Sequence, residues 1–343
     1  MAQGGSIRSL THGLANDIRS VGYPGCNNLK NTMNGRALIY GTIAIDTLIT
    51  PGGQVNSVLG GSGPYAALAA RLVTDKMDMV GVIGDDFPEA WTQALELRGV
   101  SMQHVAREKG QTFAWTGQYE EDMNNRTTVS RTEGVQEHWV MQLPQELREC
   151  SIAVATNVTP RLQNRMLQQC PHACFRMADS MKSWLEREQE YATELLQQVD
   201  LMLMNDEEAQ FWARTDDSLE AGEKLLAAGP RYAIVKHGSA GSTLFHRTPE
   251  GETRLFRCPA WPLKHAQDPT GAGDAYMGAL AGYLTKCLNG GNPAWEDMKR
   301  GVAIATVVAA AVCEKFGTIS LFSLGIHELA RRIAAFQKMT NWE

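Results

Sequence analysis

The chain has 343 residues, enough for one large domain or two smaller ones. Its formal net charge of −6 argues against a nucleic-acid-binding surface, which is usually basic. The longest apolar run, at 301–313, is too short to span a bilayer, so we expect neither a nucleic-acid nor a membrane partner.

The first 36 residues show no sustained hydrophobic period and carry one acidic residue against four basic ones. We interpret residues 1–35 as a disordered extension before a single domain at 36–343. Two alternatives stay open: residues 1–32 are an organelle transit peptide, or translation starts at Met33. The seven cysteines have no framework spacing, which favours a reducing compartment, and we expect a cytoplasmic protein.

Apolar strands then alternate with amphipathic helices. The strand patterns are at 37–43, 77–83, 152–158, 200–204 and 232–236. The helical patterns are PYAALAARLV, FPEAWTQALELRG, WLEREQEYATELLQQV and SLEAGEKLLAAG. Strands that alternate with helices predict an α/β fold with a mainly parallel central sheet covered on both faces. Ligands then bind beyond the carboxyl ends of the strands.

Two stretches interrupt this alternation. Residues 48–61 and 112–134 are rich in turn residues and contain β-branched and aromatic side chains. They are typical of a small separate β-sheet, and we expect it to form a lid over the strand ends.

The string DPTGAGDAYMGAL at 268–280 predicts an anion site at the start of a helix. The first turn of a helix presents unpaired N–H groups and the positive end of the macrodipole. Gly271 and Gly273 allow close approach to that backbone, and Asp274 follows directly. A carboxylate beside an anion site is suited to act on a third group that is brought up to the anion.

Three other glycine-rich motifs are excluded. No Walker A string is present, and GAGDAYMG does not match the spacing of the Rossmann fingerprint. GGSGP at 60–64 ends in proline, so it is not a nucleophile elbow. A nicotinamide-dependent oxidoreductase is therefore not expected.

Further polar groups follow other strands. Asn205 and Glu208 lie one helical turn apart in NDEEA, and such a pair can hold water around a magnesium–phosphate complex. Lys236 and Gly238 follow another strand, and Gly238 would let a nucleotide lie against the backbone. Phosphoryl transfer needs phosphate donors, a metal and a carboxylate that positions the attacking hydroxyl, and these segments can supply them.

This combination resembles the ribokinase-like, or PfkB, carbohydrate kinase family over residues of about 37–335. The shared features are the pair Gly60–Gly61 before a helix, VGVIGDDF, N-x-x-E, K-x-G and D-x-T-G-A-G-D. The resemblance implies a three-layer α/β sandwich with a mainly parallel sheet and a small β-sheet lid.

By this resemblance Asp274 is the catalytic base, with Gly271, Ala272 and Gly273 as the anion hole. The other implied positions are Asp46, Gly60 and Gly61 for the acceptor, Asn205, Glu208, Lys236 and Gly238 for the nucleotide, and Asp268 and Thr270 for a monovalent cation. Glu208 would act on Mg²⁺ through water. The implied cofactors are ATP, Mg²⁺ and K⁺.

Two departures from ribokinases concern the acceptor. Tyr65 stands where those enzymes have an asparagine, and it offers a ring and one hydroxyl. Trp115, Tyr119 and Arg126 in the lid segment could stack on a base or meet an anionic sugar acid, and Trp115 could equally be lid core.

We therefore expect an ATP-dependent phosphotransferase that phosphorylates a hydroxyl group of a sugar or sugar derivative. The alternatives are a nucleoside kinase of the same family and a catalytically idle PfkB-like regulatory subunit. We also expect a homodimer formed through the lid.

Overall fold

The computed structural model describes residues 35–121, 123, 125–288 and 291–340. The chain divides into two units, 1–32 and 33–343, and only the second contains described residues. The three interpretations of the first 34 residues therefore lie outside the described part. Within the described ranges, no helix is both long and apolar enough to cross a membrane.

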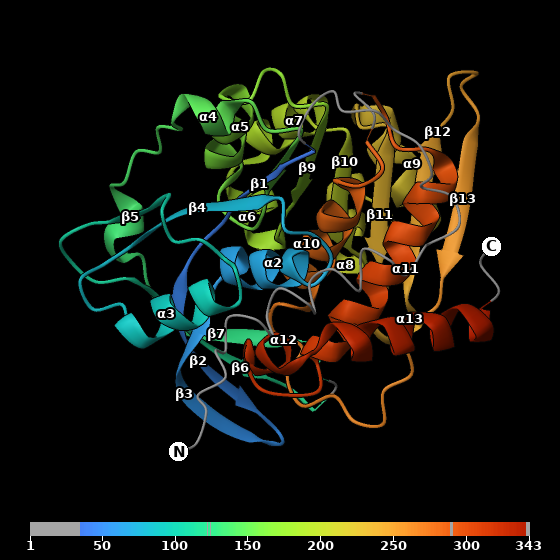
Figure 1. Ribbon diagram of the computed structural model, residues 1–343. Coiled ribbons are helices and arrows are strands. Elements are labelled where there is room, and N and C mark those ends of the chain that lie inside the picture. Colours follow the sequence, from blue (N-terminus) through green and yellow to red (C-terminus); the bar gives the residue numbers. More distant parts are fainter. Residues whose placement is uncertain (1–34, 122, 124, 289–290, 341–343) are drawn as a thin grey trace, which may run out of the picture. The chain divides into compact units, whose positions relative to one another are not determined.

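A nine-stranded sheet forms the centre of the unit (Figure 1). Its spatial order is β13-β12-β11-β10-β9-β8-β1-β4-β5. The strands are β1 (Ala37–Tyr40), β4 (Met77–Ile83), β5 (Val105–Arg107), β8 (Ile152–Ala155), β9 (Phe175–Asp179), β10 (Leu201–Asn205), β11 (Tyr232–Lys236), β12 (Ser242–Arg247) and β13 (Thr253–Cys258). Pairing is parallel from β5 to β11, and only β12 and β13 are antiparallel additions at one edge.

Helices cover both faces of this sheet. Successive side chains of a strand point to opposite faces, so the sheet contributes to two apolar cores. In β1, Ala37 and Ile39 belong to one apolar cluster, whereas Leu38 and Tyr40 belong to the other. The first cluster includes residues of α2 (Ser62–Arg71), α3 (Glu89–Leu97), α10 (Ala272–Leu284), α11 (Trp295–Val312), α12 (Ile319–Ser323) and α13 (Ile326–Thr340). The second includes residues of α4 (Gln145–Arg148), α5 (Pro160–Gln168), α6 (Lys182–Arg187), α7 (Gln189–Gln198), α8 (Asp206–Ala213) and α9 (Ser218–Ala228).

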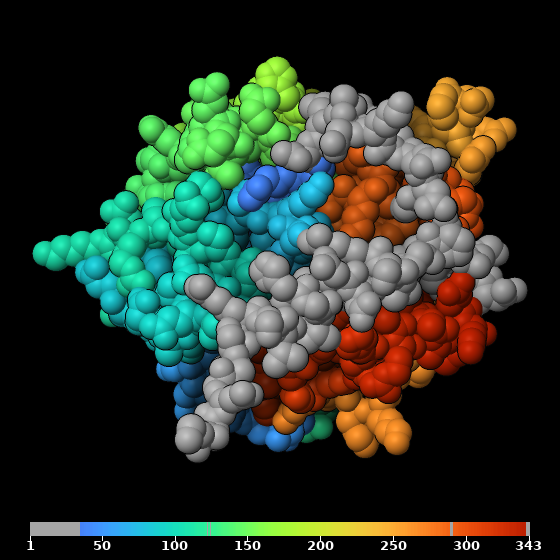
Figure 2. Space-filling view, viewed as in Figure 1, coloured from blue at the N-terminus to red at the C-terminus, as the bar shows by residue number. Residues whose placement is uncertain are grey.

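The outer helix α13 shows how amphipathic spacing builds the first of these layers. Leu329, Ile333 and Phe336 recur at intervals of four and three and are buried, so one stripe of the helix faces the core. Its other side lies along the surface, as Figure 2 shows in red.

A second, four-stranded sheet has the order β3-β2-β6-β7. It consists of β2 (Ala44–Thr50), β3 (Gly53–Gly60), β6 (Phe113–Tyr119) and β7 (Arg126–Thr132). Two antiparallel hairpin pairs are joined by the parallel pair β2–β6. This sheet follows β1 directly and stands apart from the large sheet, below it in Figure 1.

The predicted α/β sandwich with a small β lid is confirmed. Three local expectations differ from the structure. The first strand ends at Tyr40 instead of residue 43, and Asp46 lies in the following strand, β2, which belongs to the lid. The long helical pattern divides at Glu188 into α6 and α7. Strand β9 was not expected, because Arg176 interrupts its apolar pattern.

Candidate functional site

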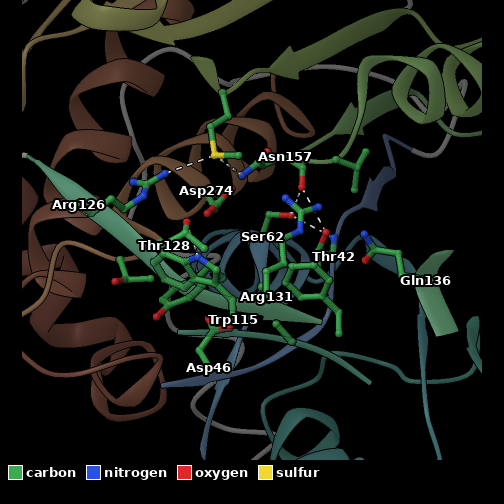
Figure 3. A pocket seen from close by; sticks show the side chains of 18 of the residues that line it. Thr42, Asp46, Ser62, Trp115, Arg126, Thr128, Arg131, Gln136, Asn157 and Asp274 are labelled. Atoms are coloured by element: carbon green, nitrogen blue, oxygen red, sulfur yellow. Dashed lines mark hydrogen bonds between the residues drawn. The ribbon is translucent and has the colours of Figure 1, made fainter. Parts of the chain in front are cut away.

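A cavity of about 830 Å³, including the space at its mouth, lies between the lid and the large sheet (Figure 3). Its lining comes from the lid, from the segments after β1, β8 and β9, and from the start of α10. The lining residues are Thr42, Ala44, Asp46, Gly61, Ser62, Tyr65, Phe113, Trp115, Tyr119, Arg126, Thr128, Arg131, Gln136, Asn157, Val158, Met181, Trp184, Thr270, Gly271 and Asp274.

The structure brings most of the expected acceptor and catalytic residues to this cavity. Asp46, Gly61, Tyr65, Arg126, Gly271 and Asp274 all line it. The cavity lies at the carboxyl ends of parallel strands, and the lid encloses it on one side. Ligands of α/β proteins bind at sites of this kind.

Gly271 turns the chain into α10. It has a left-handed conformation, with φ 75°, as the residue before the first helical turn. A Cβ built there would also lie 2.3 Å from the ring of Tyr65, so no other residue fits without displacing that ring. Asp274 consequently stands in the first turn of α10, beside the unpaired N–H groups of the helix start.

The surroundings of Asp274 act on its charge in two directions. Burial raises the pKa of its carboxyl group above the ordinary value, while Lys236 and Arg126 lower it. A carboxylate with a raised pKa and two cations nearby, at a helix N-terminus, has the properties of a general base that works beside an anion.

Asp46 is the second acidic residue of the cavity. Its side chain is 3% exposed, and its Oδ1 atom has no hydrogen-bond partner within the described residues. Burial raises its pKa to about 7, although a hydrogen bond from the Gly61 backbone lowers it. Gly60 leaves room for this carboxylate, because a Cβ there would lie 1.8 Å from Asp46 Oδ2. A buried acceptor oxygen without a donor is suited to bind a ligand hydroxyl.

Asn205 and Glu208 form a capping box at the start of α8. The Asn205 backbone N–H donates to Glu208 Oε2 at 2.8 Å, and the Glu208 N–H donates to Asn205 Oδ1 at 2.8 Å. Burial raises the pKa of Glu208, and Lys236 and Arg126 lower it. The motif therefore has a structural role, and its carboxylate also lies within the electrostatic reach of both cations.

Lys236 connects the expected nucleotide residues to the anion hole. Its Nζ atom lies against the start of α10, where a Cβ built on Gly273 would be 2.9 Å away. It lowers the pKa values of Glu208 and Asp274 as well. The ammonium group is thus placed where a negatively charged phosphate would meet the helix N-terminus.

Gly238 lies outside the cavity lining, in the exposed turn that follows β11. Its neighbour His237 holds this turn: Nδ1 contacts Asp206 Oδ1 at 2.7 Å and Nε2 contacts Thr243 Oγ1 at 2.8 Å. The turn thus joins the start of α8 to β12.

Asp268 and Thr270 precede the anion hole. The Asp268 carboxylate accepts the Thr270 N–H at 2.9 Å and the Gly317 N–H at 2.7 Å, and it is fully buried. Thr270 lines the cavity and donates its hydroxyl to Tyr119 of the lid at 2.9 Å. Through Gly317 these contacts join the loop before α10 to the segment that precedes α12. Through Tyr119 they join the same loop to the lid.

Arg126 is the first residue of β7, and its guanidinium lies within electrostatic reach of Glu208 and Asp274. Desolvation lowers its pKa, but Tyr119, Glu208 and Asp274 together raise it above the ordinary value. It also donates to Met181 Sδ at 3.5 Å (Figure 3). The lid therefore contributes a cation to the same region as Lys236.

Asp179 is a candidate residue that the sequence did not reveal. It ends the unexpected strand β9, is 4% exposed, and its Oδ1 atom has no partner in the described chain. Burial raises its pKa, Asp274 and Glu208 raise it further, and Lys236 lowers it. The sequence signal that could have identified Asp179 is its position as an aspartate at the carboxyl end of a parallel strand.

The sequence pattern also identified only some of the aromatic residues that line the cavity. Arg131 lies between two rings, 5.2 Å from the centre of Phe113 and 4.8 Å from that of Trp184. Trp184 donates its Nε1–H to Asn157 Oδ1 at 3.0 Å. These residues come from three separate segments, and none belongs to a recognisable motif.

The part of the chain that the structure describes contains no cluster of three or more His, Cys, Asp or Glu side chains arranged to hold a metal ion. Within the same part, Cys150, Cys170, Cys174, Cys258 and Cys313 are free thiols.

The site combines a parallel α/β sheet, a small lid, a helix N-terminus with a carboxylate, and two cations that face it. Together these are features of a phosphotransferase of small molecules. The chain belongs to the family described as pfkB family carbohydrate kinase, whose sequence model matches residues 36–323. It is a carbohydrate or nucleoside kinase.

Individual relatives agree with this membership. A cytidine kinase from Thermococcus kodakarensis is 27% identical over 281 residues, which cover 79% of this chain and 95% of the relative. A ribokinase from Arabidopsis thaliana, solved with ribose and ATP, has a TM-score of 0.68 at 18% identity over 88% of this chain and 99% of that one. A nucleoside kinase from Burkholderia thailandensis, solved with inosine, has a TM-score of 0.67 at 17% identity over 89% and 99%.

Proposed function

We propose that the protein transfers the γ-phosphoryl group of ATP to an alcohol group of a sugar or nucleoside, with Asp274 as the general base. The observation that carries this proposal is the position of Asp274, in the first turn of α10 and in the same cavity as the unpartnered carboxylate of Asp46.

In the proposed reaction Asp46 accepts a hydrogen bond from an acceptor hydroxyl, which orients the molecule. Asp274 takes the proton of the reacting hydroxyl as the hydroxyl oxygen attacks the γ-phosphorus of ATP. The bond from that phosphorus to the β–γ bridging oxygen breaks, and ADP leaves. Lys236 and Arg126 support this step, because their positive charge keeps part of Asp274 ionised against the effect of burial.

The anion hole consists of the backbone at Gly271, Ala272 and Gly273. Its N–H groups and the helix dipole stabilise the charge on the transferred group. Lys236 lies at Gly273, and Arg126 approaches from the lid, so two cations add to this stabilisation. Asn205 and Gly238 are the remaining proposed nucleotide contacts.

Two buried carboxylates fit a hydrated Mg²⁺ ion. Glu208 has one oxygen bonded to Asn205 N–H, and Asp179 has an oxygen without a partner in the described residues. Burial raises the pKa of both groups, so a bound cation would stabilise their charged forms. Mg²⁺ bound there with ATP would spread the negative charge of the phosphates.

A bound K⁺ ion at Asp268 and Thr270 is less well supported by the geometry. Both oxygens of the Asp268 carboxylate already accept backbone N–H groups. We therefore derive no step from a monovalent cation.

The homodimer through the lid also stays a prediction. The lid offers β3 and β7 as its edge strands, and an unpaired edge is a surface on which a second strand can pair. The expected cytoplasmic location likewise stays a prediction.

The decisive experiment measures ADP formation by the purified full chain with Mg·ATP and a panel of sugars, sugar acids and nucleosides. We expect acceptor-dependent ADP formation, with a phosphorylated product of matching mass. ATP hydrolysis that no acceptor accelerates would contradict the proposal, provided that the chain is folded and binds ATP.

A further inference from the structure

The aromatic wall of the cavity indicates which acceptor class it fits. Phe113, Trp115 and Tyr119 alternate along β6, and Trp184 joins them from α6. Positions i, i+2 and i+6 of a strand have the same parity and share one face, and all three lid rings line the cavity. Aromatic rings attract one another beyond the area that they bury, so this face is suited to a flat aromatic ring of the ligand.

Trp115 is held in position by its neighbours. Its benzene ring lies against Gly117, where a built Cβ would approach to 2.0 Å of Cη2. Its Nε1–H donates to Thr128 Oγ1 across the hairpin at 3.1 Å, and the Arg126 guanidinium lies 5.9 Å from the ring centre. Figure 3 shows Trp115, Thr128 and Arg126 together on one side of the cavity. A fixed, half-buried ring offers contact area at little cost in conformational entropy.

The cations of the cavity are already compensated. Arg131 pairs with Glu133 at 2.5 Å, and Arg126 faces Tyr119, Glu208 and Asp274. An anionic acceptor such as a sugar acid would need positive charge that no carboxylate neutralises. The charge balance therefore favours a neutral acceptor.

Most polar groups near Asp46 are bonded to one another. Ser62 Oγ accepts from the Thr42 N–H at 3.1 Å and from Thr156 Oγ1 at 2.9 Å, and it donates to the Asn157 carbonyl at 3.2 Å. The Asn157 side chain is bonded to Trp184 and Met181. Among the described residues that line the cavity, Asp46 Oδ1 and the Tyr65 hydroxyl are buried and have no partner, which suits a ligand with a small hydroxyl-bearing part.

We propose that the acceptor is a nucleoside, with its sugar hydroxyls at Asp46 and its base against the ring of Trp115. This inference rests on the proposed function for the reacting end of the cavity, but it concerns binding and can be tested without turnover. Stacking of a base on an aromatic side chain adds affinity that a free sugar does not gain, which distinguishes nucleosides from free sugars.

The test is isothermal titration of the full chain, with Mg²⁺ and a non-hydrolysable ATP analogue present, against cytidine, uridine, adenosine, inosine, ribose and gluconate. We expect at least one nucleoside to bind 100-fold or more tightly than ribose and gluconate. Trp115→Leu should weaken that nucleoside tenfold or more and leave ribose within twofold, while Trp115→Phe should retain most of the affinity. Val129→Ala, on the exposed side of the same hairpin, is the matched control.

The melting temperature of each variant shows whether it is folded, and Trp115→Phe keeps the test valid if Trp115→Leu is not. Ribose or gluconate binding as tightly as every nucleoside would overturn the inference, as would equal losses for ribose and nucleoside in Trp115→Leu. If free sugars alone bind and are phosphorylated, the inference fails and the proposed function stands. If a nucleoside binds tightly through Trp115 but no compound of the panel is phosphorylated, the proposed function fails and only the nucleoside-binding site stands.

Discussion

The ring of Tyr65 lies directly on the backbone of Gly271, which connects the start of α2 to the anion hole at the start of α10. Tyr65 is 1% exposed, and its hydroxyl has no hydrogen-bond partner among the described residues. The side chain that stands in place of the ribokinase asparagine thus supports the floor of the cavity. Its main contribution is packing, with one edge available to an acceptor.

Gly271→Ala should lower both stability and activity. The new Cβ would meet the Tyr65 ring and would occupy a left-handed conformation, and each defect costs about 1–3 kcal/mol. Chemical denaturation measures the loss. Gly325→Ala is the control, because a Cβ there meets nothing within 4 Å. Tyr65→Phe should fold and turn over normally, and a large loss in that variant would show that the hydroxyl binds the acceptor.

Asp274→Asn should lower kcat by about 10²–10⁴-fold, the usual range for a general base. The KM for ATP should change little, because the amide has the same shape. The unfolding midpoint should not fall, because burial disfavours the charged carboxylate that the amide replaces. Steady-state kinetics with the acceptor from the screen checks this. A variant that keeps a tenth of the wild-type turnover would assign the base to another residue.

Asp46→Asn should make the free protein more stable at pH 8. The pKa of Asp46 is about 7 in the folded protein and about 3.9 in the unfolded chain. The folded state therefore holds a proton that the unfolded state loses, so the free energy of unfolding falls as pH rises from about 4 to 7. The gain for the variant is at most on the order of 4 kcal/mol, since one pKa unit corresponds to about 1.4 kcal/mol.

The same variant should bind the acceptor more weakly, because it loses the charged oxygen that would accept a hydroxyl. Urea denaturation at pH 5 and pH 8, with KM measured at pH 8, separates the two effects. Equal stability differences at the two pH values would show that Asp46 does not titrate in this range.

Glu208→Gln should raise the Mg²⁺ concentration needed for half-maximal activity. The glutamine carbonyl can still accept the Asn205 N–H, so the start of α8 should remain stable. Glu208→Ala removes that contact and should cost about 1 kcal/mol of stability in addition. A magnesium titration that Glu208→Gln leaves unaltered would restrict Glu208 to its capping role.

Arg126→Ala should shift the acidic limb of the pH–rate profile to higher pH. The arginine lowers the pKa of Asp274, so its removal leaves the base protonated over a wider range. Arg126→Lys retains the charge and should move the limb less. An unchanged profile in Arg126→Ala would place the guanidinium away from the base when the acceptor is bound.

The sequence alone determined the class of fold and predicted the proposed reacting end of the site. Strand and helix periods are local properties of the chain, so the α/β alternation and the two lid segments could be recognised directly. The anion hole and Asp274 occupy one short string, 271–274, and helix N-terminal chemistry follows from that string without knowledge of its surroundings.

Only the tertiary structure decided the acceptor end. Phe113, Arg131 and Trp184 stack although they come from β6, β7 and α6, and no local pattern predicts such a contact. Asp46 belongs to the lid because the chain leaves the large sheet after Tyr40. The apolar pattern continues from β1 into β2, so the sequence does not reveal this change of sheet. Asp179 acquires its raised pKa from burial beside Asp274 and Glu208, which are distant in sequence. Side-chain packing and desolvation depend on neighbours in space, and the folded chain alone brings those neighbours together.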